Sequence, residues 1–128
     1  MRIVRIQSDK KYAKLDDDIT FTIEYESPLT DEEMNTDWDI YYTPDIIFRE
    51  KRRQCTVSRQ NESQSVILHV QDFKNTLIGL TTIELRNVGC FTLSHTFNGK
   101  TEDIILVVQT YTEDEVNVVL ERAVEQVL

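Results

Sequence analysis

The chain has 128 residues, the length of one domain, and a domain of this size buries about two thirds of the surface that its unfolded chain exposes. Hydrophobic residues make up 40% of it and charged residues 29%, so it is too apolar for a disordered protein. The formal net charge of −9 opposes binding to nucleic acid and to anionic lipid, and no apolar run approaches the roughly 18 residues of a membrane-spanning helix. The opening residues 1–6 also lack the apolar run of a signal peptide, so we expect the protein to stay in the compartment where it is made.

The composition favours β-strands, because the chain holds twelve Val, twelve Ile and fourteen Thr against only two Ala. Strict alternation of apolar and polar residues over residues 19–26 predicts a strand with one buried face. Weaker patterns of the same kind predict further strands at residues 2–7, 38–42, 46–50, 54–59, 65–70, 81–85, 91–97 and 101–110. Residues 73–80 are either a short loop or a single helical turn.

Asn98-Gly99 is the strongest turn signal, because these two residues best tolerate the positive φ angles that a type I′ hairpin turn requires. The strand that follows it contains residues 104–108, all of them apolar, so both faces of the strand carry apolar side chains there. Such a run is typical of a central strand that is covered on both faces. We therefore expect both sides of residues 104–108 to be buried.

Over residues 112–128 the spacing of apolar residues changes from the two-residue period of a strand to the spacing of a helix. Residues 112–115 have the sequence of a helix capping box, and Val116, Leu120, Ala123 and Val127 follow at spacings of four, three and four. This pattern predicts an amphipathic helix over residues 112–128, packed on the preceding domain of residues 1–111 or on a partner. The whole chain is therefore predicted to be mainly β, an immunoglobulin-like or jelly-roll-like β-sandwich of seven to nine antiparallel strands with one C-terminal α-helix.

Few side chains are suited to catalysis or to metal binding. His69 is expected to face outward and His95 to be a partly buried, hydrogen-bonded strand residue, and neither has an evident nucleophile to activate. Cys55 and Cys90 lack the paired spacing of a zinc site and are expected to be buried free thiols, although a disulfide between them stays open. Asp16-Asp17-Asp18 could offer oxygen ligands to calcium but lacks the EF-hand pattern. We predict a non-enzymatic protein with no catalytic residue, no cofactor and no metal.

Charges divide into two segments of opposite sign. Residues 16–47 hold eleven acidic residues and no Lys or Arg, whereas residues 49–53 hold four basic residues in five. Two opposite charges on one domain favour head-to-tail pairing with a neighbour, although solvated turns would give the same pattern. With the apolar stripe of the predicted helix, the candidate interface residues are Asp31, Glu32, Glu33, Asp37, Trp38, Arg49, Lys51, Arg52, Arg53, Val116, Leu120 and Val127.

The order of these segments resembles small β-sandwich virion proteins of tailed bacteriophages, such as baseplate or tail adaptor domains and related proteins of gut phages. The resemblance rests on residues 18–23, 38–42 and 77–85 and on the Asn98-Gly99 hairpin, and it covers roughly residues 2–109. It implies an architectural protein of the virion, in the tail, neck, baseplate or capsid-associated parts. The partners that it implies are other virion proteins and copies of the same chain, with no nucleic acid, membrane or small-molecule substrate.

Two other functions stay open on the residues alone. The aromatic residues Trp38, Tyr41 and Tyr42 would suit a carbohydrate-binding or receptor-binding module if they were exposed together. A small cytoplasmic regulator encoded by a mobile element would instead bind one host protein.

Overall fold

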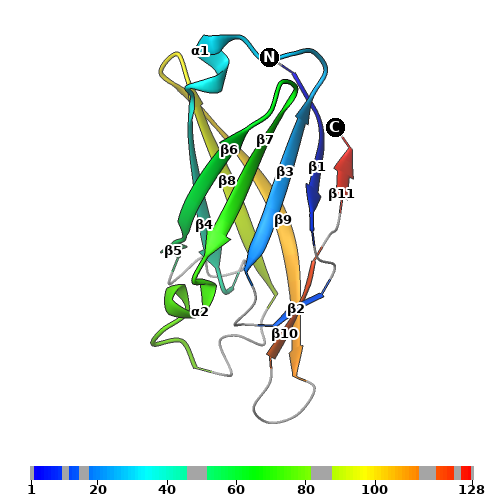
Figure 1. Ribbon diagram of the computed structural model, residues 1–128. Helices are drawn as coiled ribbons and strands as arrows, with labels where there is room; N and C mark the ends of the chain where they lie inside the picture. Colours follow the sequence, from blue (N-terminus) through cyan, green and yellow to red (C-terminus); the bar gives the residue numbers. More distant parts are fainter. Residues whose placement is uncertain are drawn as a thin grey trace.

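The computed structural model describes residues 2–9, 12–14, 18–45, 52–81, 88–112, 118–122 and 125–127. Over these residues the chain forms eleven strands and two short helices, and the strands make two antiparallel sheets that pack face to face (Figure 1). The protein is therefore mainly β, as predicted, with the layered architecture of a β-sandwich. Both described helices have four residues, far fewer than a membrane span needs.

The first sheet contains five strands. These are β1 (Ile3–Ser8), β3 (Ile19–Tyr25), β6 (Thr56–Asn61), β7 (Ser65–Gln71) and β11 (Glu125–Val127). They lie in the order β11-β1-β3-β7-β6. Phe21 of β3 lies opposite Leu68 of β7, so the alternating apolar residues of both strands point to the same inner side.

The second sheet contains six strands. These are β2 (Tyr12–Lys14), β4 (Asp37–Thr43), β5 (Arg53–Gln54), β8 (Gly89–Phe97), β9 (Lys100–Thr112) and β10 (Val118–Arg122), in the order β2-β10-β9-β8-β4-β5. The turn between β8 and β9 has φ angles of 51° at Asn98 and 76° at Gly99. Both are positive, as the sequence predicts for this hairpin.

The core between the sheets is centred on four aromatic rings. Phe21 of the first sheet meets Phe91 of the second edge to face, with ring centroids 5.3 Å apart. Phe73, in helix α2 (Phe73–Thr76), and Tyr42 of β4 pack on Phe91 at 5.4 Å and 5.1 Å. These contacts join both layers and α2 into one hydrophobic cluster.

The predicted C-terminal helix is wrong over the described residues, which form β10 and β11 instead. Residues 116–127 contain five Val and one Ala, and β-branched residues favour strands over helices. Strand β10 pairs with the long β9, and β11 pairs with β1, so the segment gains ladder hydrogen bonds in both sheets. A lone helix of this length is marginal in water, so strand pairing wins.

Most of the other predicted strands are present in the structure. The strands expected at residues 2–7, 19–26, 38–42, 65–70, 91–97 and 101–110 are present. The strand expected at residues 54–59 is divided into β5 and β6. The described residues hold eleven strands against the seven to nine expected, because of this division and because β2, β10 and β11 form in segments predicted as connection or helix. Residues 46–50 and 82–85 of two further predicted strands lie outside the described residues. Of the two alternatives for residues 73–80, a short loop or a single helical turn, the structure has the helical turn, α2.

Candidate docking surface

The outer side of the second sheet carries a group of largely apolar side chains on three of its six strands, β4, β8 and β9. The strand register places them in two rows that run across the sheet. One row is Thr43, Cys90 and Val107, and the other is Tyr41, Thr92 and Ile105. We call these six residues the open face.

Ile105 and Val107 of the open face are exposed to solvent. Ile105 keeps 54% of its surface accessible and Val107 keeps 47%, whereas Leu106 and Val108 between and beside them are buried in the core. The expectation that both sides of residues 104–108 are buried is therefore wrong for the outer side. The reason is that the first sheet covers only the inner side of β9, and an apolar pattern cannot show how many layers a fold provides.

A hollow with a volume of about 350 Å³ lies on the open face. Its floor is formed by Cys90 and Thr92, which point outward and yet are only 7% and 8% exposed. They are covered because side chains of the flanking strands rise on both sides of β8. The floor is thus already desolvated while the walls, Ile105 and Val107, are still in contact with water.

Opposite charges stand at the two edges of the hollow. Arg52 lies at the β4–β5 edge, with its guanidinium 3.7 Å from the ring centroid of Tyr41. Asp103 lies at the β9 edge, where its carboxylate accepts a hydrogen bond of 2.6 Å from the Ser94 hydroxyl. Both charged side chains are therefore held by a neighbour in the sheet.

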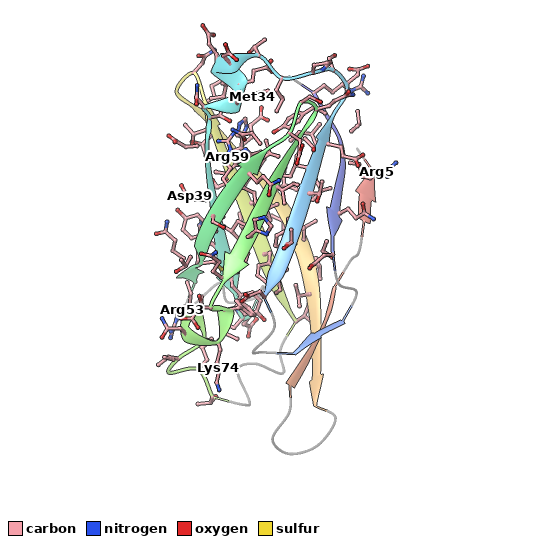
Figure 2. The ribbon with its side chains drawn as sticks, in the orientation of Figure 1. Arg5, Met34, Asp39, Arg53, Arg59 and Lys74 are labelled. Carbon is pink, nitrogen blue, oxygen red and sulfur yellow. The ribbon has the colours of Figure 1, made fainter. Side chains whose placement is uncertain are left out.

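The two described basic candidates, Arg52 and Arg53, make different contacts. Arg52 is exposed at the rim of the hollow. The guanidinium of Arg53 donates instead to the backbone carbonyls of Ile78 at 2.5 Å and Thr76 at 3.4 Å, so it fastens the segment that follows α2 (Figure 2). Arg49 and Lys51 lie outside the described residues.

The acidic candidates surround helix α1 (Asp31–Met34), which the sequence analysis did not predict. Thr30 caps this helix and Glu33 completes a capping box, with hydrogen bonds of 3.1 Å and 3.2 Å between them. The backbone hydrogen bond from Thr30 holds the pKa of Glu33 below its usual range. The signal was present in the sequence as Thr-x-x-Glu at residues 30–33. Asp31 and Glu32 are exposed, as expected of a solvated acidic surface.

Trp38 was a candidate interface residue, but the structure places it in the core, where only 9% of its surface is exposed. It follows the alternation of β4, which directs Asp37 and Asp39 outward and Trp38 inward. Its indole stacks on His95 of β8 with ring centroids 4.4 Å apart. Tyr42 is also buried, so the aromatic platform required for a carbohydrate-binding module is not formed by these residues.

Helix α1 and the β6–β7 turn lie at the same end of the sandwich (Figure 1). A cluster of polar side chains joins α1 to β6 at this end. Arg59 of β6 donates to the carbonyl of Thr36 and, at 2.7 Å, to the side chain of Asn61, which in turn donates to the carbonyl of Met34 (Figure 2). These bonds hold α1 against β6. Within the described residues Trp38 Nε1, Arg59 Nη2 and His95 Nε2 are buried without a hydrogen-bond partner. Burial lowers the pKa of His95 below its usual value.

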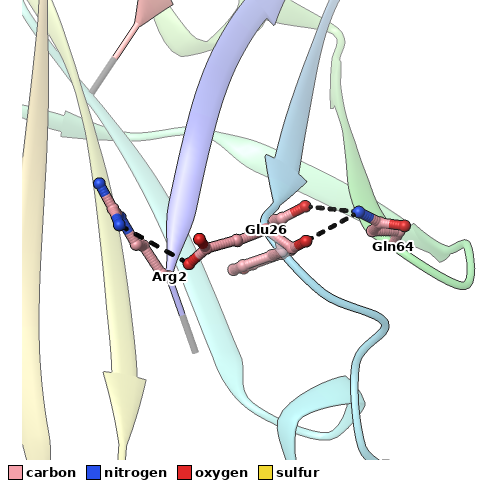
Figure 3. A network of polar contacts seen from close by, with 4 residues as sticks. Arg2, Glu26 and Gln64 are labelled. Carbon is pink, nitrogen blue, oxygen red and sulfur yellow. Dashed lines mark hydrogen bonds and ion pairs between the residues drawn. The ribbon is translucent and has the colours of Figure 1, made fainter.

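A second hollow, of about 340 Å³, adjoins the β6–β7 turn and is lined largely by polar residues. Its centre is Gln64, whose amide donates to the carbonyls of Tyr25 at 3.0 Å and Glu26 at 3.2 Å (Figure 3). The carboxylate of Glu26 lies 3.7 Å from the Arg2 guanidinium. These contacts join the turn to β3 and β1, so this hollow is part of the structural framework.

The candidate catalytic side chains are dispersed. His69 lies on the outer side of the first sheet, with Nδ1 3.1 Å from the Thr20 hydroxyl, while His95 lies in the core. Cys55 and Cys90 are buried free thiols, as predicted, and burial raises the pKa of Cys55 to about 12. Among the described residues, no group of three His, Cys, Asp or Glu side chains is placed to hold a metal ion.

The remaining candidates belong to the C-terminal segment. Val116 lies outside the described residues, Leu120 belongs to β10 and Val127 belongs to β11. These three positions therefore do not form a helical stripe over the part of the segment that is described.

Comparison of the chain with known protein families, with curated proteins and with solved structures finds no match. The resemblance to virion proteins gains no support from these comparisons and stays a prediction. The open face is accordingly the feature from which a function is best inferred.

Proposed function

We propose that this protein is a non-enzymatic structural protein that acts by docking on other proteins through its open face. The observation that carries the proposal is the exposure of Ile105 and Val107 beside a hollow whose floor is already buried. Contiguous exposed apolar groups mark interaction sites, since covering them yields about 25 cal/mol per Å² of apolar surface. Arg52 and Asp103 at the rim would orient the partner.

We further propose that the docking takes place in the particle of a tailed bacteriophage, in a tail, neck, baseplate or capsid-associated position. The support is the sequence resemblance, together with a two-sheet domain that carries its apolar surplus on an outer side. Other virion proteins and copies of this chain are the expected partners. The net charge of −9 disfavours contact with the packaged nucleic acid.

For the finer fold class, we propose an immunoglobulin-like sandwich in preference to a jelly roll. The strand orders β1-β3-β7-β6 and β5-β4-β8-β9 correspond to the A-B-E-D and C′-C-F-G orders of immunoglobulin domains. Trp38 then lies on the strand that carries the buried tryptophan of those domains. The Phe21–Phe91 contact joins the two strands that a disulfide joins in antibodies. Cross-strand amide contacts measured by NMR would test this order.

The docking function can be tested in the host that carries the gene. A double variant, Ile105→Asp with Val107→Asp, places two charges on the open face without touching the core. The control is Ile67→Asp, which changes the same type of residue on the outer side of β7. After lysis, particles are purified on a density gradient and probed for the protein.

We expect the wild type and Ile67→Asp in the particle fraction and the double variant in the soluble fraction. Thermal unfolding of each purified protein tests whether all three are folded. Absence of the wild-type protein from the particles would overturn the virion assignment. Retention of the folded double variant in the particles at the wild-type level would overturn docking through the open face.

A further inference from the structure

The tip of the β8–β9 hairpin places a nucleophile beside a side-chain amide. The strand ladder ends at the pair Phe97–Lys100, so Asn98 and Gly99 form a turn of two residues, and both are exposed. Their φ angles are positive, as in a type I′ turn. The backbone nitrogen of Gly99 therefore lies outside the ladder and directly follows Asn98 in the chain.

The surroundings of the turn leave this nitrogen and the Asn98 amide uncovered. A Cβ atom placed on Gly99 would have no heavy atom within 4 Å, so nothing packs over the second turn residue. Over the ranges that the structure describes, no hydrogen bond holds the side chain of Asn98. Glycine also brings no Cβ of its own next to the nitrogen.

We propose that Asn98 is a site of spontaneous covalent modification, at which the side-chain amide is converted to a carboxylate. The backbone nitrogen of Gly99 gives its proton to water and attacks Cγ of Asn98. The new N–Cγ bond closes a succinimide ring, the Cγ–Nδ2 bond breaks, and ammonia leaves after taking a proton from water. Water then opens the ring at either of its two carbonyl carbons and gives aspartate or isoaspartate.

The folded turn controls how fast the ring can close. At the first position of a type I′ turn, the backbone angles hold the next nitrogen on the side of the Cα–C bond away from Cβ. Attack therefore requires rotation about the Cα–C bond of Asn98, which breaks the turn conformation. Because no atom packs over the turn at Gly99, this rotation opens only the tip, while the rest of β8 and β9 stays paired.

Three other asparagines in the described part of the chain are internal controls. Asn35 donates a hydrogen bond of 2.9 Å to the carbonyl of Asp31, and Asn61 donates one of 3.1 Å to the carbonyl of Met34, so both amides are held in place. Asn75 lies in helix α2. Each of the three is followed by Thr or Glu, whose Cβ hinders the attacking nitrogen.

The experiment incubates the purified protein in neutral and in mildly alkaline buffer and follows each asparagine by peptide mass spectrometry with fragmentation. We expect conversion at Asn98 well before any conversion at Asn35, Asn61 or Asn75. The rate at Asn98 should rise with pH, because base removes the proton of the attacking nitrogen. The Asn98→Asp variant supplies the standard that separates the aspartate product from isoaspartate.

Gly99→Asn is the matched variant. Asparagine tolerates a positive φ angle and its Cβ meets no heavy atom at this position, so the turn is retained. The new Cβ stands beside the attacking nitrogen, so this variant should convert few of its chains at Asn98 while the wild type converts most. In wild-type protein unfolded by urea, conversion at Asn98 should be faster than in the folded protein, because no turn then restrains the rotation.

The two products have different effects on the hairpin. Aspartate at position 98 keeps the turn, because it also tolerates the left-handed conformation. Isoaspartate carries the main chain through Cβ, which lengthens the turn and displaces the pair Phe97–Lys100. Amide hydrogen exchange at the tip should therefore rise in the isoaspartate form and stay unchanged in Asn98→Asp.

Conversion at Asn98 that is absent, or no faster than at Asn61, would overturn the inference. A Gly99→Asn variant that converts as fast as the wild type would overturn the attack by the Gly99 nitrogen. Equal rates in the folded and the urea-unfolded protein would overturn the control by the turn. None of these outcomes bears on docking, because Ile105 and Val107 lie further along β9, away from the tip.

Discussion

The outer sides of the two sheets face the same solvent and yet are built differently. On the first sheet, cross-strand polar pairs occupy the outer side: Thr20 meets His69 at 3.1 Å, and Arg5 meets Glu24 at 3.5 Å. On the second sheet, the corresponding positions of β8 and β9 hold the apolar open face. The solvent side of an antiparallel sheet is usually polar, so the apolar outer side of the second sheet is the feature on which the proposed docking rests.

The residues on the outer side of a sheet contribute little to the free energy of folding. The free energy of folding comes chiefly from the inner sides, where aromatic and aliphatic residues of both sheets interlock. Outer positions can therefore change in chemistry without loss of the fold, which is how one sheet can carry a docking surface. Four predictions, taken from the largest expected effect to the smallest, test this comparison.

Phe91→Ala should destabilise the protein by about 3–5 kcal/mol, because Phe91 is fully buried against three other aromatic rings. Ile105→Ala, on the opposite side of the same sheet, should cost about 1 kcal/mol or less in the dilute protein, since half of that side chain is already exposed. Urea unfolding followed by Trp38 fluorescence measures both values. Equal losses would contradict the division between an inner side that stabilises and an outer side that docks.

Stability should fall as the pH drops below about 6.5, the usual pKa of histidine. Burial lowers the pKa of His95 in the folded state, while Glu102 opposes this shift and Arg59 reinforces it. The unfolded chain therefore binds a proton at a higher pH than the folded protein, and the loss reaches at most about 1.4 kcal/mol per pH unit.

The pH effect is measured by urea unfolding between neutral and acidic pH. His95→Gln should flatten the dependence. A pH profile that His95→Gln does not alter would show that His95 is not its source.

Thr30→Ala should destabilise the protein by about 1 kcal/mol, because it removes the hydroxyl that caps α1. The matched control is Asp72→Asn at the N-cap of α2, where the side chain makes no capping bond and the φ angle is 51°, a conformation that Asn tolerates. The control should change the stability by less than about 0.5 kcal/mol. Thermal unfolding of both variants gives the comparison, and a larger effect at Asp72 would reverse the assignment of roles.

Glu24→Gln should change the stability by roughly 0.5 kcal/mol or less, because its ion pair with Arg5 is largely exposed on the polar outer side. The same variant should leave particle incorporation unchanged. A loss of incorporation in Glu24→Gln would mean that the polar outer side of the first sheet also takes part in docking.

How far the fold could be foreseen depended on how local each signal was. The alternation in residues 19–25 and the positive φ angles of Asn98 and Gly99 are properties of short segments, and both expectations are confirmed. The capping-box pattern stands at residues 30–33 and again at residues 112–115, where a helix was predicted. It begins a helix at Thr30, but at Thr112 it lies at the end of β9, because the segment that follows pairs with β9 and β1.

The candidate site was foreseen only in part, for the same reason. Arg52 was singled out from its charge, and it does stand at the hollow, but Arg53 beside it is bound to backbone carbonyls of the segment after α2. Trp38 was among the candidate interface residues, whereas the alternation of β4 directs it into the core. Ile105 and Val107 were expected to be buried.

The sequence by itself determined the strands, the hairpin turn and which side chains share one side of each strand, since these follow from the residue period and from the backbone preferences of single residues. Only the tertiary structure decided which of those sides is covered and where the C-terminal segment pairs. Covering a side requires a second layer, and pairing a strand requires an open edge, and both are supplied by residues far away in the chain.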